Sequence, residues 1–393
     1  MTEQRLRQAL RERPVPGERE AAERTLRVLR AAHAGAAPAA ARRRPLLRPA
    51  LALLLALAAL GTVLSPAGAD VRRWIGDRLD PEPSTTLGPL PAQGRLLVSS
   101  GAGSSVVNAD GSLRRLGDYS SADWSPRGLF VVTAHGRRLY AVEPDGTVRW
   151  SIVRPSAVTH PAWSPGDGYR VAYLEGGDLR VVTGSGVGDD RVAGPAAPVT
   201  PAWRPGAGYV LSYVTRGGAI ATLDVSSGRV LWRAHVGERP TELEWSARGD
   251  RLVALTATGV RAFGRGGAPG PARSLPHGAG ARVMAVHPSG RSVAVADSRD
   301  GVMGLSLARP GRAPRTLFDG EGRFSGLAWS PDGRWLLAGW RDADQWVFIG
   351  SPGAGRGAPG ARRVVTFSRI TEQLDPAAGQ ARGFPRVEGW CCG

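Results

Sequence analysis

The chain has 393 residues, 51 of them basic and 34 acidic, which gives a formal net charge of +17 at neutral pH. Every basic residue is an arginine, which excludes the phosphate-binding loops that need a lysine. The two cysteines, Cys391 and Cys392, are adjacent and cannot join distant elements; the six scattered histidines add no further ligands, which excludes a zinc site.

Residues 1–45 form a basic segment without strand character. Up to residue 48 the chain holds twelve Arg and five Glu. Apolar residues at Ala22, Leu26 and Leu29 have helical spacing and predict a short amphipathic helix. We therefore expect a helical segment here, and we expect it to be cytoplasmic because a predicted membrane segment comes directly after it.

Residues 46–69 are predicted to be a transmembrane helix. Pro49–Ala69 is rich in Leu and Ala and has no ionisable side chain. Its length, about 30 Å as a helix, matches the hydrocarbon core of a bilayer. The arginines directly before it predict a cytoplasmic N-terminus and an extracytoplasmic C-terminal part, because positive residues favour the cytoplasmic side. Those arginines are Arg42, Arg43, Arg44 and Arg48.

A cleaved signal peptide is the alternative to an anchor. Ser65–Ala69 ends in a small-x-small pattern after an apolar run, as signal-peptidase sites do, so cleavage near Ala69 would release the rest of the chain. Both interpretations export residues 70–393. Residues 70–91 are predicted to be a juxtamembrane linker, in which Val71–Leu79 suits either a headgroup-level helix or an ordinary linker helix.

A tryptophan-turn unit recurs through the remaining chain. The steps between the first residues of successive units are 39, 40, 42, 42 and 42. A period near forty residues, built from short apolar strands and Gly/Asp turns, is typical of propeller blades. The units are Trp124–Gly128, Trp163–Gly168, Trp203–Gly208, Trp245–Gly249, His287–Gly290 and Trp329–Gly333.

Each repeat predicts four strands, and the ends of the chain predict how the ring closes. In the last repeat the strands are 326–329, 334–340, 345–349 and 362–367. Residues 95–117 read as three strands without a leading tryptophan strand, while 385–390 read as a leading strand with nothing after it. Together they would form one blade and leave no long free edge. We therefore predict an all-β propeller over residues 92–393 with seven blades, or six if the match at Trp390 is accidental.

The Trp-Ser-Pro-Asp-Gly unit at Trp329 resembles the repeat of bacterial TolB-like and WD-repeat-like propellers. The resemblance covers residues 92–370 and is strongest in the units led by Trp124, Trp163 and Trp329. It weakens at Trp203 and Trp245, and at His287 only the spacing remains. It implies a propeller that serves as a binding platform, without implying any activity.

The repeat tryptophans are predicted to be structural wedges between adjacent blades. We interpret His287 as a substituted core position rather than a metal ligand. Cys391 and Cys392 are expected to fill and end the closing strand; a vicinal disulfide, or pairing with other chains, is the alternative. The structural repeat positions are Trp124, Trp163, Trp203, Trp245, His287, Trp329 and Trp390.

One pattern gives an enzyme hypothesis some support. Ala221–Trp232, and more loosely Tyr140–Trp150, resemble the tryptophan-docking repeats of quinoprotein propellers, some of which place a vicinal cysteine pair against the cofactor. Here only two such units occur, the cysteines end the chain, and no Ca²⁺-binding carboxylate set can be assigned. The docking tryptophan is structural in that family, so we expect no catalytic, cofactor-binding or metal-binding residues and no enzyme.

The leading hypothesis is a non-catalytic, membrane-anchored, extracytoplasmic propeller that binds a protein, peptide or cell-envelope ligand. Exposed turns such as Gly176–Gly177, Asp189–Asp190 and Arg299–Gly301 are the candidates for contact. A transmembrane signalling regulator resembling anti-sigma factors is the first alternative, and a quinone-dependent oxidoreductase is the second. The arginines are interleaved with Asp and form no basic stripe, so no nucleic acid is expected as a partner.

Overall fold

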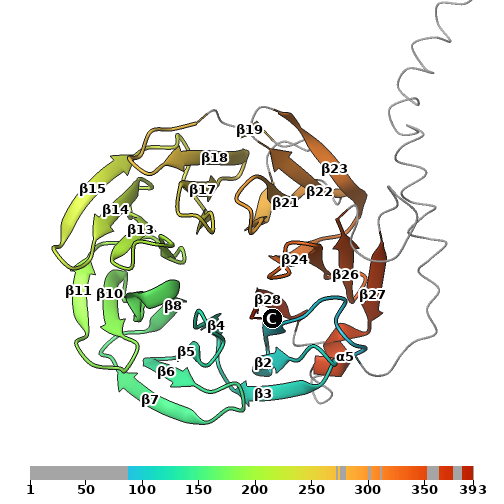
Figure 1. Cartoon of the computed structure of the whole chain (residues 1–393), viewed down its shortest axis with the longest axis horizontal. Helices are drawn as coiled ribbons and strands as arrows, with labels where there is room; N and C mark the ends of the chain where they lie inside the picture. Colours follow the sequence, from blue (N-terminus) through green and yellow to red (C-terminus); the bar gives the residue numbers. More distant parts are fainter. Residues whose placement is uncertain are drawn as a thin grey trace, which may run out of the picture. The chain divides into compact units, whose positions relative to one another are not determined.

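The computed structural model describes residues 87–392, except for 271–272, 275–279, 300–301, 310–311, 352–362 and 375–382. Within these residues, seven four-stranded antiparallel sheets stand around a central axis (Figure 1). The predicted propeller and its seven blades are confirmed, and the six-blade alternative is wrong. The predicted cytoplasmic segment 1–45 and membrane helix 46–69 lie outside the described residues. No helix among the residues described is long and apolar enough to cross a membrane.

The first three blades follow one another along the chain, each running from the inner strand to the outer one. Their strands average about five residues, the usual strand length. Blade 1 comprises β4 (Ser121–Trp124), β5 (Val131–His135), β6 (Arg138–Val142) and β7 (Val148–Val153); blade 2 comprises β8 (Val158–Trp163), β9 (Arg170–Glu175), β10 (Asp178–Thr183) and β11 (Asp190–Ala193); blade 3 comprises β12 (Ala202–Trp203), β13 (Val210–Val214), β14 (Ile220–Asp224) and β15 (Arg229–Ala234).

Blades 4 to 6 repeat this order. Blade 4 comprises β16 (Glu242–Trp245), β17 (Arg251–Leu255), β18 (Gly259–Gly264) and β19 (Arg273–Ser274); blade 5 comprises β20 (Ala281–Val286), β21 (Val293–Arg299), β22 (Val302–Arg309) and β23 (Arg312–Glu321); blade 6 comprises β24 (Phe324–Trp329), β25 (Trp335–Trp340), β26 (Gln345–Gly350) and β27 (Val364–Ser368). A short 3-10 turn, η1 (Gly166–Gly168), precedes β9, and a short helix, α5 (Ile370–Leu374), follows β27.

Blade 7 joins the two ends of the propeller. Its inner strand is β28 (Arg386–Cys391), and its other strands are β1 (Arg95–Ser100), β2 (Gly103–Val107) and β3 (Leu113–Gly117). β28 pairs antiparallel with β1, with Leu96 opposite Trp390. The closing role predicted for the C-terminal strand is therefore confirmed, and β1 is not left as an open sheet edge.

The turn after each inner strand explains the repeated serine and glycine. The Ser330 side-chain oxygen accepts a hydrogen bond from Trp335 N–H at 2.9 Å, and Gly333 N–H donates to Ser330 C=O at 2.8 Å. Gly333 has φ +68°, a conformation that glycine adopts without steric cost. Ser125, Ser164 and Ser246 accept the equivalent hydrogen bond in their blades. The serine therefore recurs because its side chain closes the turn, and the glycine recurs because the turn needs a positive φ.

The hydrophobic core is divided among the interfaces between blades. The buried residues form seven clusters, and each cluster combines residues of two neighbouring blades. A single four-stranded sheet could not bury both of its faces, so each blade depends on its neighbours. Two short segments add to blade 7: Leu90, in the sequence assigned to the linker, and Ile370 of α5 are both buried in the cluster between blades 6 and 7.

Candidate functional site

The structure places the repeat tryptophans at the blade interfaces. All six are buried, and each belongs to the cluster that its blade shares with the preceding one. Three of them also donate their indole N–H to the preceding blade: Trp203 to Ala162 C=O, Trp245 to the Ser212 hydroxyl and Trp329 to Ala285 C=O. These side chains hold blades together.

His287 has a different role from the tryptophans. It is half-buried, and its ring packs edge-on against Trp329 of the following blade at 4.6 Å between centroids. Its Nδ1 accepts a hydrogen bond from Ser289 N–H, so Nε2 carries the proton and donates to Gly333 C=O at 3.0 Å. His287 therefore links two tryptophan-turns.

Cys391 and Cys392 form a vicinal disulfide at the end of the closing strand. The pair lies against the first tryptophan-turn: a Cβ on Gly128 would come within 2.8 Å of Cys392 Sγ. Arg95 Nη2 donates to Gly128 C=O at 2.7 Å in the same region. The cysteines thus occupy the place that Ser-Pro has in the turns after Trp124, Trp163 and Trp329, and they lie where the closing blade meets blade 1.

The two tryptophans of the quinoprotein-like units are also blade contacts. Trp150 donates its indole N–H to Gly184 C=O, and Trp232 donates to Arg265 C=O, in each case in the following blade. Both tryptophans lie on outer strands, β7 and β15, and far from the cysteine pair in sequence. The cysteine pair is instead at the end of an inner strand, β28. Within the described residues, no group of three or more His, Cys, Asp or Glu side chains is arranged to hold a metal ion.

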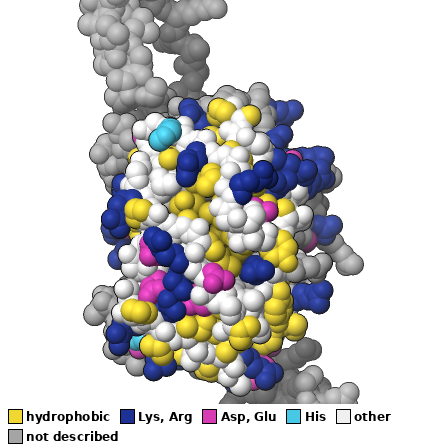
Figure 2. Space-filling model, turned by 90° about the vertical axis from the view of Figure 1, so that its left-hand side faces the viewer, with side chains coloured by type: hydrophobic (Ala, Val, Ile, Leu, Met, Phe, Trp, Pro, Cys, Tyr) yellow, Lys and Arg dark blue, Asp and Glu magenta, His cyan; other side chains and the backbone are white. Residues whose placement is uncertain are grey.

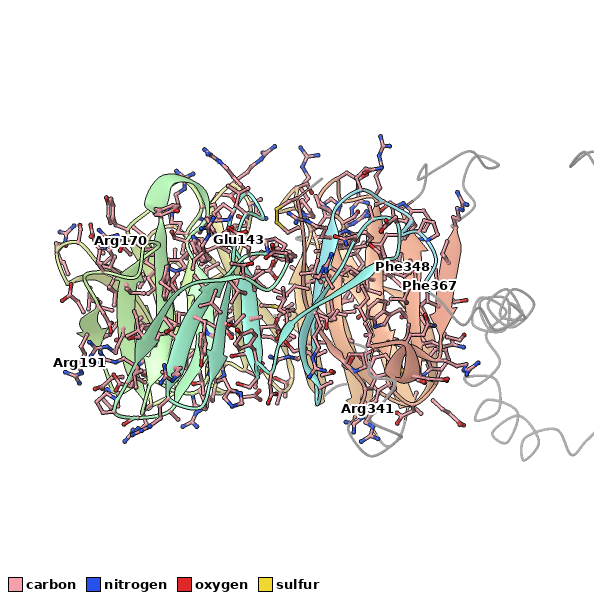
Figure 3. All side chains as sticks on the ribbon, turned by 90° about the horizontal axis from the view of Figure 1, so that it is seen from below. Glu143, Arg170, Arg191, Arg341, Phe348 and Phe367 are labelled. Carbon is pink, nitrogen blue, oxygen red and sulfur yellow. A yellow bond between two sulfur atoms is a disulfide. The ribbon has the colours of Figure 1, made fainter. Side chains whose placement is uncertain are left out.

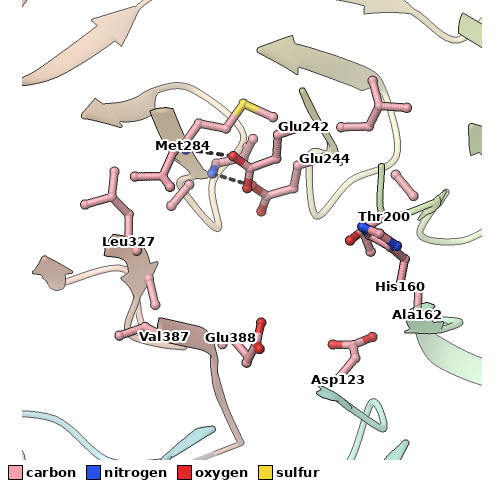
Figure 4. Close-up of a pocket in the computed structure, with 18 of the residues that line it drawn as sticks. Asp123, His160, Ala162, Thr200, Glu242, Glu244, Met284, Leu327, Val387 and Glu388 are labelled. Atoms are coloured by element: carbon pink, nitrogen blue, oxygen red, sulfur yellow. Dashed lines mark hydrogen bonds between the residues drawn. The ribbon is translucent and has the colours of Figure 1, made fainter. Parts of the chain in front are cut away.

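The inner strands of the ring enclose a central channel of about 1020 Å³. Acidic side chains line it, and sequence reasoning missed them (Figure 4). Their signal was an i, i+2 pattern on inner strands, which puts both side chains on one face, as in Glu242-Leu243-Glu244 and Arg386-Val387-Glu388. The four acids are Asp123, Glu242, Glu244 and Glu388.

Three of these acids bind the backbone of the next blade. Asp123 accepts a hydrogen bond from Trp163 N–H at 2.6 Å. Glu242 and Glu244 accept from Met284 N–H and Val286 N–H at 2.9 and 2.8 Å. An innermost strand has one edge without a partner strand, and these carboxyl groups satisfy donors on that edge. Asp123, Glu242 and Glu244 are therefore links between inner strands.

The surrounding protein makes ionisation of the channel acids unfavourable. Burial raises the pKa of Asp123 to about 7, against the two backbone N–H groups that favour the charged form. Burial likewise raises the pKa of Glu242 to about 7 and that of Glu244 to about 8, where the neighbouring Glu242 charge adds to the effect. The pKa of Glu388 is also raised by burial, although the Arg386 guanidinium, 2.7 Å away, opposes this.

We expect Glu242→Gln/Glu244→Gln to weaken the pH dependence of stability. Raised folded-state pKa values mean that the acids stabilise the fold fully below about pH 4, and that this contribution is lost as the pH rises through about 7 to 8. Glutamine keeps the acceptor oxygen and does not ionise. Between pH 5 and pH 9 the unfolding free energy of the wild type should fall by about 1–2 kcal/mol more than that of the variant. The difference is limited to this size because channel water screens part of the effect.

Chemical denaturation at both pH values measures this difference. Glu321→Gln is the matched control, because Glu321 is exposed at the end of β23. A variant that retains the wild-type pH slope would contradict the assignment.

A buried charge network ties blade 1 to blade 2. Arg154, after β7, reaches Glu175 at 2.8 Å and Asp189 at 2.9 Å, and Arg180 reaches Asp189 at 3.1 Å. The buried Tyr173 hydroxyl donates to Asp189. Figure 2, which shows the side of the ring that carries β10 and β11, has acidic side chains directly beside arginines. The network is satisfied internally and leaves no free group for chemistry.

One face of the ring carries a row of exposed apolar side chains. We call the face formed by the tryptophan-turns the Trp-turn face; Arg170 lies on it, and Arg341 lies on the opposite face (Figure 3). Leu129, Tyr169 and Tyr209 each follow a tryptophan-turn, in blades 1, 2 and 3, and are 59, 53 and 46% exposed. We call these three residues the apolar row. Sequence reasoning missed it, although the positions five or six residues after the repeat tryptophan are its signal.

Local structure fixes the aromatic side chains of the apolar row in their exposed positions. Tyr169 has φ +44° and ψ +48°, a left-handed conformation that is strained for a bulky residue. Its ring lies over Gly184, where an added Cβ would come within 2.6 Å. The Arg170 guanidinium stacks on the Tyr209 ring, 4.7 Å from its centroid. The row therefore combines fixed aromatic surface with positive charge.

The turns expected from sequence to make contacts lie elsewhere. Gly176–Gly177 connects β9 to β10. Asp189 belongs to the charge network, so it is committed to its own fold. Arg299 ends β21, and the two residues after it lie outside the described part of the chain.

Comparison with known families agrees with the repeat. The family model described as "WD domain, G-beta repeat" matches residues 313–349, from β23 to β26. The chain is a seven-bladed propeller that carries a WD repeat. No curated protein matches it in sequence.

Several solved structures resemble the chain in fold at low sequence identity. The Cps50 (Swd1) β-propeller domain of Myceliophteria thermophila has a TM-score of 0.53 at 15% identity and covers 65% of this chain and 93% of that one. A chain of the Mitotic Checkpoint Complex has a TM-score of 0.52 at 18% identity, covering 74% and 86%. Kuenenia stuttgartiensis hydrazine synthase, an enzyme, has a TM-score of 0.50 at 16% identity, covering 58% and 75%. At these identities the likeness concerns the fold alone.

Proposed function

We propose that this chain is a non-catalytic propeller that binds a protein or peptide partner through the apolar row. The observation that carries the proposal is the exposure of large apolar side chains at equivalent positions of three consecutive blades. Exposed apolar patches with polar surroundings are typical of protein-binding surfaces. Arg170, stacked on Tyr209, adds a charged donor that favours a partner segment with an acidic residue next to its apolar ones.

The channel acids support a non-catalytic role. Asp123, Glu242 and Glu244 already accept backbone hydrogen bonds between blades, which gives them a structural function. Reconstitution of the chain with a quinone and Ca²⁺ tests the enzyme alternative, and appearance of bound-quinone absorbance would contradict our proposal.

Cross-linking in the source cells tests the binding surface. The test variant is Leu129→Ser/Tyr169→Ser/Tyr209→Ser in the full chain. The matched control replaces three exposed apolar residues of outer strands, Leu113, Val148 and Leu231, with Ser. We expect at least one partner that the wild type and the control capture and the test variant loses. If no captured protein depends on the apolar row, the proposal is wrong.

We further propose that the propeller, whose repeat resembles that of TolB-like proteins, is extracytoplasmic and held by Pro49–Ala69 as a single-pass anchor. The uncharged run and the arginines before it support this. N-terminal sequencing of the chain from membrane fractions should find the residues before Pro49 retained. A sequence that starts at Asp70 would indicate a cleaved signal, and would also remove the cytoplasmic segment that an anti-sigma-like regulator needs.

A further inference from the structure

A second, smaller cavity lies between blades 2 and 3. Its volume is about 250 Å³, and it opens beside the central channel, with Thr159 and Pro198 bordering both cavities. The turn between β9 and β10 flanks it through Gly177, and the turn between β13 and β14 flanks it through Arg216. We call this cavity the interblade pit.

The floor of the pit is apolar and held in place by backbone hydrogen bonds. Ala196 and Ala197, from the Pro-rich connection between β11 and β12, are buried there beside Leu174. Ala196 N–H donates to Gly177 C=O at 2.7 Å, and Arg216 N–H donates to Pro195 C=O at 3.0 Å. The connection is thus tied to the turns of both blades, so the pit is formed before any ligand arrives.

Two guanidinium groups stand at the mouth of the pit. Arg239 Nη2 donates to Arg216 C=O at 2.9 Å, which holds Arg239 over the turn. A Cβ on Gly177 would lie 3.2 Å from Arg216 Nη2, so the missing side chain lets that guanidinium approach the backbone. In the described part of the chain, neither arginine forms an ion pair. Asp178, which Arg216 influences electrostatically, is paired with Arg191 at 2.8 Å.

The ring contains its own comparison for this arrangement. Arg154 lies in the connection between blades 1 and 2, and Arg239 lies in the connection between blades 3 and 4. Each follows an outer strand. Arg154 meets two carboxylates, those of Glu175 and Asp189. Arg216 and Arg239 instead keep their charge beside an apolar floor. An apolar body with one negative group therefore complements the pit.

We propose that the interblade pit binds a carboxylate that carries a short aliphatic side chain, such as a free acyl amino acid or the C-terminal residue of a peptide. The paired guanidinium groups would bind the carboxylate, for which their planar donor sets are suited. The aliphatic group would cover Ala196, Ala197 and Leu174. The cavity is smaller than the 300–1000 Å³ usual for whole small-molecule ligands, which fits a single residue. This site is separate from the apolar row.

Ligand-observed NMR titration of the full chain with N-acetyl-leucine tests the proposal. We expect saturable binding of N-acetyl-leucine and no saturable binding of N-acetyl-leucinamide, which has the same shape without the charge. Arg216→Gln/Arg239→Gln should weaken binding of the acid by about tenfold or more. Arg137→Gln is the matched control, because Arg137 is an exposed arginine of the corresponding turn in blade 1, and it should bind the acid as the wild type does.

A second arm of the same experiment tests whether the natural carboxylate belongs to a peptide end or to a small acid. A peptide that ends in leucine should bind more tightly than N-acetyl-leucine if the natural ligand is a chain end, and more weakly if it is a small acid. The amidated peptide should not bind in either case. Equal binding of acid and amide, or acid binding unchanged in the double arginine variant, would overturn the proposal. Because the arginines are exposed, the unfolding midpoint of that variant should match the wild type and exclude misfolding as the cause.

Discussion

Trp390→Ala should lower the free energy of unfolding by about 3–5 kcal/mol, the usual cost of removing a buried tryptophan side chain. Trp390 is buried among Leu337, Trp346 and Phe348 of blade 6, and its strand pairs with β1. The substitution therefore weakens both the interface between blades 6 and 7 and the closure of the ring. Urea denaturation followed by far-UV circular dichroism measures the change.

Trp232→Ala is the matched control for this prediction. Trp232 is half-buried on the outer strand β15 and takes no part in closure, so its loss should cost only about 1–2 kcal/mol. Deletion of residues 386–393 should have a larger effect than either substitution, since it uncovers the full edge of β1. A Trp390→Ala protein as stable as Trp232→Ala would mean that β28 contributes little to holding the ring together.

Arg154→Met should destabilise the chain by about 3 kcal/mol, because it leaves Glu175 and Asp189 charged and incompletely paired at a blade interface. The Arg154, Glu175 and Asp189 side chains are only 19, 10 and 13% exposed, so water cannot replace the lost partner. Adding Glu175→Gln should recover part of the loss, since it removes one of the unpaired charges. A double-mutant cycle measured by chemical denaturation gives the coupling.

Arg191→Met removes an ion pair of similar geometry at the surface. Arg191 and Asp178 are 55 and 40% exposed, so this substitution should cost less than about 1 kcal/mol. Similar losses for Arg154→Met and Arg191→Met would show that the interface network does not stabilise the contact between blades 1 and 2.

The repeat made the fold predictable because each of its residues is needed for local structure, either to close a turn or to fill a blade interface. Ser330 and Gly333 close a turn, and Trp329 fills the interface with the blade before it. The same serine-closed turn recurs in blades 1, 2 and 4, and the other blades keep the spacing, so the repeat located the strands. The closing strand was predictable because the pattern around Trp390 had no strands after it, while that around Arg95 had no strand before it.

The candidate sites depend on partners that no local pattern specifies. Asp123 meets Trp163 N–H, and Glu242 meets Met284 N–H, about forty residues away along the chain. Whether an acid in a strand faces solvent or the channel depends on which strand is innermost. The exposed positions of Tyr169 and Arg216 likewise follow from how neighbouring blades sit side by side, which the sequence of one repeat does not contain.

The pairing of β28 with β1 also constrains how the protein folds. Blades 1 to 6 are each built from strands close together in sequence, so they can form locally as the chain is made. Blade 7 must wait for a strand from the far end of the propeller. Until then β1 exposes unpaired backbone groups that other chains could bind, so the slowest and most aggregation-prone stage of folding should be the last one. A propeller closed in this way gains its stability late, and as a whole.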